Sequence, residues 1–143
     1  MGRVLSIDFG KARVGLAISD ETQTIAQGLP TINYKSEKEL IARIRKIIEE
    51  QGVSEIVIGN PISLSGKQTK RSSEVLLFLA KLKKTIPLPI RLLDERLTSQ
   101  LSMRILGTVY SKVSRQKEAI DKLAATIILK DYLTTKKNQP ETG

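Results

Sequence analysis

The sequence predicts a single α/β domain built on a mixed five-stranded sheet. Three strand-like segments come first and are joined by short turns, which favours antiparallel pairing. Two further apolar strands then alternate with helical patterns, as parallel crossover connections require. The 143 residues are 40% hydrophobic and 27% charged, which is typical of a globular domain. We expect this domain to cover residues 1–134, followed by a disordered tail at 135–143.

The chain should open with an antiparallel meander. Residues 3–9 alternate, so that Val4, Ser6 and Asp8 share one face of a strand. A turn at 10–13 then leads to a second apolar run at 14–19, the pattern of a β-hairpin. A third strand over 24–32 would return antiparallel to the second.

The middle of the chain carries clear helix signals. Ser36 and Glu39 form a capping box ahead of an apolar stripe at helical spacing, and Gly52 is a natural helix end. The segment EIVIGNP that follows is continuously apolar, as in strands covered on both faces.

The second half is predicted to alternate loops and helices. A polar loop at 59–71 precedes a second helix, and IRLLDE at 90–95 is the next strand. Thr98 is a candidate cap for a short helix, residues 107–118 form a basic loop, and the last helix covers about 118–134.

Composition narrows the possible functions. The chain has 24 Lys and Arg against 15 Asp and Glu, a net charge of +9, which favours nucleic acid or another polyanion as partner. It contains no His and no Cys, which excludes a thiol nucleophile, an imidazole base and a His/Cys zinc site. No apolar run approaches the roughly 20 residues of a membrane span, and the N-terminus enters a strand pattern at once. We therefore expect a cytoplasmic protein without membrane contact.

Acids lie where apolar elements would prefer hydrophobic residues. Asp8 ends the first strand, and Asp121 shares a helix face with Ala124 and Ala125. Asp94 and Glu95 end the last strand on opposite faces, and alternation alone does not choose between them. Turn chemistry, a structural ion pair or the helix dipole could also explain single acids. Together they suggest a site for hard divalent metals, which can cleave a phosphodiester without His.

Four motifs resemble the YqgF (RuvX-like) family, and they cover the chain from about residue 3 to residue 133. They are D-x-G-x-x-R-x-G-x-A at 8–17, IVIGNPISLSG at 56–66, LLDERLTS at 92–99 and AIDKLAATIILKDYL at 119–133. The resemblance implies an RNase H-like fold and activity as a pre-16S rRNA nuclease in ribosome maturation or as a Holliday junction resolvase. It also implies Asp8, Glu95 and Asp121 as catalytic residues and as ligands of Mg²⁺ or Mn²⁺, which selects Glu95 over Asp94.

Basic residues of the motifs and of the two predicted loops are candidates for nucleic-acid binding. Tyr110 is the one aromatic residue in those loops, which favours recognition of backbone and shape over base stacking. The candidates are Lys11, Arg13, Lys67, Lys70, Arg71, Arg96, Thr98, Lys112, Arg115 and Lys117.

Two other function classes compete with a nuclease. One is a nucleic-acid-binding ribosome-assembly module without catalysis, and the presence of all three acids argues against it. The other is a phosphotransferase of the actin and sugar-kinase group, which needs two such domains where this chain supplies one. A resolvase would act as a homodimer to cut two strands symmetrically, whereas a processing nuclease could be a monomer.

Overall fold

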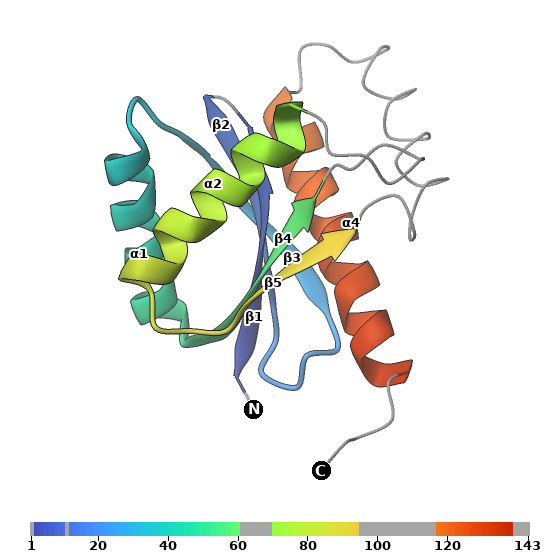
Figure 1. Ribbon diagram of the computed structural model, residues 1–143. Helices are drawn as coiled ribbons and strands as arrows, with labels where there is room; N and C mark the ends of the chain where they lie inside the picture. The colour runs from blue at the N-terminus through green and yellow to red at the C-terminus, as the bar shows by residue number, and fades with distance from the viewer. Residues whose placement is uncertain (1, 11, 61–69, 95–116, 139–143) are drawn as a thin grey trace.

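The computed structural model of the protein describes residues 2–10, 12–60, 70–94 and 117–138, without the side chains at 94, 117–121, 137 and 138. A five-stranded sheet of order β3-β2-β1-β4-β5 is covered by α1 and α2 on one face and by α4 on the other (Figure 1). The elements are β1 (Arg3–Phe9), β2 (Arg13–Ser19), β3 (Ala26–Asn33), α1 (Glu37–Gln51), β4 (Val53–Asn60), α2 (Lys70–Thr85), β5 (Ile90–Asp94) and α4 (Lys117–Asn138). The predicted mixed sheet is confirmed.

Strand directions agree with the predicted meander and crossovers. β1 pairs antiparallel with β2, and β2 pairs antiparallel with β3. β4 then pairs parallel with β1, and β5 pairs parallel with β4. In this register Ile7 lies opposite Ile58, and Asn60 lies opposite Asp94. Hence β1, β4 and β5 all end at one edge, which we call the carboxyl edge of the sheet; the opposite end is the amino edge.

Helix α1 begins and ends at the predicted residues. The Ser36 hydroxyl accepts a hydrogen bond from the Glu39 amide at 3.2 Å, which satisfies a donor of the first turn. Gly52 ends the helix with a φ of 69°, a left-handed conformation that costs a glycine little.

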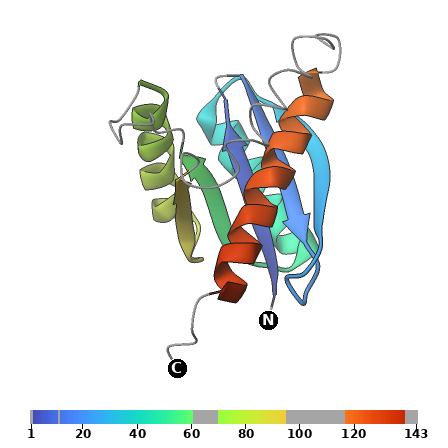
Figure 2. The same cartoon turned by 90° about the vertical axis from the view of Figure 1, so that its right-hand side faces the viewer.

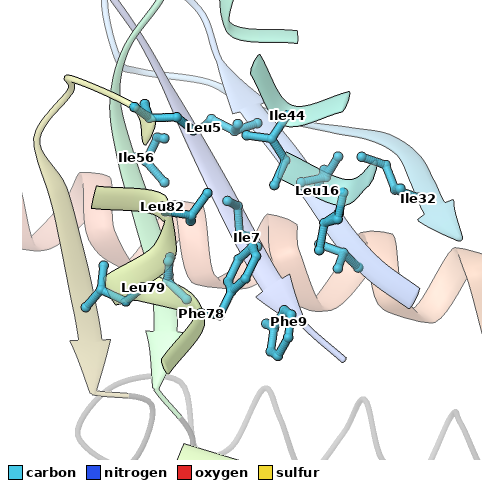
Figure 3. Close-up of a cluster of buried hydrophobic side chains, with 14 of the residues drawn as sticks. Leu5, Ile7, Phe9, Leu16, Ile32, Ile44, Ile56, Phe78, Leu79 and Leu82 are labelled. Carbon is cyan, nitrogen blue, oxygen red and sulfur yellow. The ribbon is translucent and has the colours of Figure 1, made fainter. Parts of the chain in front are cut away.

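The sheet separates two hydrophobic clusters. Leu5, Ile7 and Phe9 of β1 point toward α1 and α2, where Phe78 and Leu82 cover them (Figure 3). On the other face, a smaller cluster packs beneath α4: Val4, Ala17, Val57, Leu93, Ala125, Ile128, Leu129 and Leu133. Figure 2 shows α4 lying across this second face. Alternation along β1 therefore places Asp8 on the α4 side.

Two of the differences between predicted and observed element ends have a reason that the structure shows. β3 begins at Ala26 instead of residue 24, because the Asp20 carboxylate accepts hydrogen bonds from the amides of Thr24 and Ile25 and holds them in a turn. α4 runs to Asn138, past the predicted end at 134, so the first residues assigned to a disordered tail are helical. Lys136 explains this extension, since it contacts Glu55 and the Tyr132 ring.

Several predictions lie outside the described residues, namely the short helix capped by Thr98 and the basic loop up to residue 116. None of the helices in the described ranges combines the length and apolarity that crossing a membrane requires.

Candidate functional site

Asp8 lies on the central strand, one residue before the end of β1, at the carboxyl edge. It is partly exposed, in contrast to its neighbours Ile7 and Phe9, which are buried in the hydrophobic cluster beneath α1 and α2. Its antiparallel partner is Gly15 of β2. The carboxylate therefore occupies the edge of the sheet face that α4 covers.

The turn after Asp8 is held in place by close packing. A Cβ at Gly10 would lie 2.5 Å from the Arg13 carbonyl oxygen, so only glycine allows this approach. The Tyr34 hydroxyl donates to the Gly10 carbonyl at 2.6 Å, and the Tyr34 amide donates to the Ala12 carbonyl at 3.1 Å. Burial, with Glu37 and Glu74 nearby, raises the pKa of Tyr34 above its usual value, so the phenol keeps the proton it donates.

The register of α4 places Asp121 at the same level as Asp8. The Ser6 hydroxyl donates to the Ala125 carbonyl at 2.6 Å, and Tyr132 further along α4 reaches Glu55 near the start of β4. α4 thus runs antiparallel to β1. Asp121 lies one turn, about 6 Å, before Ala125, and Asp8 lies two strand residues, about 6.6 Å, beyond Ser6. Because α4 and β1 run in opposite directions, both displacements point toward the carboxyl edge, and they have nearly the same length. The backbone at Asp121 therefore lies level with Asp8.

The third predicted acid, Glu95, lies outside the described residues. Leu93 is the last residue of β5 with a described side chain, and it packs in the cluster on the α4 side. Its partner in β4 is Gly59, next to the paired ends Asn60 and Asp94. The described end of β5 therefore reaches the carboxyl edge beside β4.

The donor types at this edge suit a hard divalent cation, since carboxylate oxygens are the ligands that Mg²⁺ and Mn²⁺ prefer. Across residues 2–10, 12–60, 70–94 and 117–138, no group of three acidic, His or Cys side chains gathers in a metal-binding arrangement. Glu95 and the Asp121 side chain fall outside that search.

A basic hollow lies at the carboxyl edge beneath the start of α2. It has a volume of about 260 Å³ and is lined by Phe9, Gly10, Lys70, Arg71 and Glu74. The Arg71 guanidinium donates to the Phe9 carbonyl at 3.3 Å, which fixes the residue directly after Asp8. Two predicted nucleic-acid contacts, Lys70 and Arg71, are thereby brought to the end of β1.

The other predicted contacts are described less fully. Arg13 is partly buried at the start of β2, and Lys117 begins α4 with an undescribed side chain. Outside the described residues lie Lys11, Lys67, Arg96, Thr98, Lys112 and Arg115.

Two buried polar residues near the site were not predicted as site residues. Asn60 is 8% exposed at the end of β4, and its Oδ1 has no hydrogen-bond partner in the described part of the chain. Ser6 is fully buried on the central strand. The signal available in the sequence was the same for both, a polar residue within an apolar strand.

The chain matches a known protein family and is similar in sequence to several named proteins. The RuvX family, described as Holliday junction resolvase, matches residues 2–135. A protein of Thermoanaerobacter pseudethanolicus named "Putative pre-16S rRNA nuclease" is 42% identical, covering 96% of this chain and 99% of its own. One of the same name from Koribacter versatilis is 39% identical, covering 92% and 86%.

Among solved structures, RuvC of T. thermophilus in complex with a Holliday junction substrate superposes with a TM-score of 0.60. The identity is 14%, over 96% of this chain and 97% of that one. At this identity the likeness shows the fold alone, and it confirms the RNase H-like fold that the sequence motifs imply.

Proposed function

This chain belongs to the RuvX family, and we propose that it is a metal-dependent endonuclease that processes pre-16S rRNA in the cytoplasm. The observation that carries the proposal is the register of α4, in which the Ser6–Ala125 hydrogen bond brings Asp121 level with Asp8. The names of the relatives, nearly 40% identical or more over almost the whole chain, support precursor rRNA as the substrate.

In this proposal Asp8, Glu95 and Asp121 hold Mg²⁺ or Mn²⁺. Glu95 follows Leu93 by two residues, the repeat of a strand, which supports a place on the α4 side. A divalent ion bound there would lower the pKa of a water and stabilise the leaving oxyanion of a phosphodiester. The carboxylates orient that ion, and the turn packed by Gly10 and Tyr34 holds Asp8 steady.

Nucleic acid would cross the carboxyl edge between the acids and the basic hollow. Lys70 and Arg71 lie on the α2 side of the end of β1, while Asp8 lies on the α4 side. A backbone bound at both sides would pass over the end of β1. Contacts of this kind to phosphate are insensitive to sequence and weaken as salt rises. Arg13, Lys117 and the undescribed basic residues would extend this surface.

The second candidate is a Holliday junction resolvase, which the description of the family favours. Both candidates use the same acids and differ in substrate. A resolvase also needs a homodimer to cut two strands symmetrically.

The test is a cleavage assay with Mg²⁺ and with Mn²⁺, on structured precursor 16S rRNA and on a four-way DNA junction. We expect the wild type to cleave the rRNA and Asp8→Asn to bind it without cleaving. Cleavage of the junction alone would select the resolvase. Cleavage of neither substrate, with salt-sensitive binding retained, would replace the nuclease by a binding module.

A further inference from the structure

We infer that Ser6 is a positioning residue that fixes the distance between the two acids by locking α4 to β1. The inference rests on the proposed function, since it concerns how that site is assembled. Ser6 touches neither substrate nor metal in this proposal. It acts through the helix that carries Asp121.

The Ser6 hydroxyl is well placed for this role. It is fully buried in the middle of the central strand, and it donates at 2.6 Å to the Ala125 carbonyl of α4. A buried hydroxyl is costly to leave unpaired, so sliding α4 along β1 would break a bond that water cannot replace. The hydrogen bond lies two residues from Asp8 and one helical turn from Asp121. A shift of α4 at this hydrogen bond would therefore move the backbone at Asp121 relative to the backbone at Asp8.

A second contact holds the same half of α4 against the sheet. A Cβ at Gly28 of β3 would lie 2.2 Å from Cγ of Lys122 and 3.4 Å from the Thr126 hydroxyl. Lys122 thus passes directly over the backbone of Gly28. Ala125, which lies between Lys122 and Thr126 in the sequence, is fully buried. Around Asp121 the helix is constrained both along β1, by Ser6, and toward β3, by Gly28.

The chain supplies a matched control in Ser19. This serine is also buried and bonds the backbone, accepting from the Val4 amide at 2.8 Å and donating to the Asp20 carbonyl at 2.9 Å. Both of its bonds lie at the amino edge and neither involves α4. Ser19→Ala should weaken the fold without moving the acids.

The experiment compares wild type, Ser6→Ala and Ser19→Ala in three measurements. They are Mn²⁺ affinity by calorimetry without nucleic acid, rRNA affinity without metal, and kcat with KM. For Ser6→Ala we expect about tenfold weaker Mn²⁺ binding and about tenfold lower kcat, the usual scale for groups that orient metal ligands. Its metal-free rRNA affinity should stay within about twofold of wild type.

Ser19→Ala should keep wild-type Mn²⁺ affinity even though it melts at a lower temperature. Wild-type Mn²⁺ affinity in Ser6→Ala, or an equal loss in both variants, would overturn the inference. If Ser6→Ala does not fold, Gly28→Ala takes its place, with the same expected weakening. A wild type that binds no Mn²⁺ would instead overturn the proposed function, so the two failures are distinguishable.

Discussion

Two acids on the same face of the sheet have opposite surroundings. Glu55 lies at the amino edge, where it is 8% exposed. It accepts from the Tyr132 hydroxyl and from the Lys136 ammonium at 2.6 Å, and its other neighbour is Arg91 at 3.7 Å. Asp8 lies at the carboxyl edge and is partly exposed, at the level where the backbone of the same helix carries Asp121.

The difference shows how one helix can give two carboxylates on the same face of a sheet different roles. At the amino edge, α4 supplies the Tyr132 hydroxyl and the Lys136 ammonium, and β5 supplies Arg91, so the cluster formed by Glu55, Tyr132, Lys136 and Arg91 is complete within the chain. We call it the Glu55 clasp. At the carboxyl edge, the backbone of α4 brings Asp121 level with Asp8, and in the proposed site the two carboxylates would repel each other unless a divalent ion lay between them. The first arrangement holds the fold together, and the second is the one that we propose binds an external divalent ion.

The sharpest test of this comparison removes one charge at each edge. Because Asp121 is a metal ligand in the proposed site, we expect Asp121→Asn to lower the single-turnover rate constant of metal-dependent cleavage by about 10³-fold or more. Glu55→Gln should stay within about twofold of wild type, since the amide can still accept from Tyr132. Both are measured under single-turnover conditions with saturating Mn²⁺. Equal losses in the two variants would mean that the edges do not differ in function.

The effects on stability should be the reverse of the effects on cleavage: loss of the acid at the amino edge should cost more than loss of the acid at the carboxyl edge. Glu55→Ala removes the acceptor of the Tyr132 hydroxyl and the ion pair of Lys136, which keeps its hydrogen bond to Gln23, and we expect it to lower the free energy of unfolding by about 2 kcal/mol. Lys136 and Arg91 are well exposed, which keeps the loss at this level. If Asp8 and Asp121 repel each other without metal, as the proposed site implies, Asp8→Asn should leave the metal-free stability unchanged or raise it by up to about 1 kcal/mol. Urea denaturation in EDTA measures both; a large loss in Asp8→Asn would assign that acid a structural role.

The contrast between the edges also separates what sequence could predict from what it could not. Asp8 stood out because a strand pattern and a following glycine surround it. The Glu55 clasp was not predicted, because its partners Tyr132 and Lys136 lie 77 and 81 residues away. Whether such residues meet depends on the direction and register of α4 across the sheet, and local patterns carry no information on either.

The same limit applied to the choice between Asp94 and Glu95. Alternation establishes that neighbouring strand residues face opposite sides, and the side must come from packing. Leu93 packs under α4, but Glu95 lies outside the described residues, so the choice of Glu95 stays a prediction. The fold itself was predictable because its signals are local: the capping box at Ser36, the stop at Gly52 and the uninterrupted apolar run of β4.

The clasp should also give stability a dependence on alkaline pH. Burial, reinforced by the hydrogen bond to Glu55, raises the pKa of Tyr132 above its ordinary value of 10.0. The unfolded chain therefore ionises this phenol first, so its contribution is complete below pH 10 and is lost as pH rises beyond it. We expect Tyr132→Phe to lower stability by about 1 kcal/mol at pH 7 and to flatten the decline above pH 10. Melting temperatures from pH 8 to 11 test this, and an unchanged slope in Tyr132→Phe would contradict it.

The smallest expected effect belongs to Asp20, a second satisfied acid at the amino edge. Hydrogen bonds from the Ile25 amide, the Thr22 hydroxyl and the Thr24 amide lower its pKa to about 2 from 3.8. Its contribution is thus present above pH 3.8 and is lost as pH falls toward 2. Asp20→Asn should melt slightly below wild type at pH 7 and converge with it near pH 2, because the amide oxygen can still accept from the turn. The adjacent Glu21→Gln removes the same charge and serves as a control. An equal pH response in the two variants would show that net charge, and not the hydrogen-bonded turn, causes the loss of stability at acidic pH.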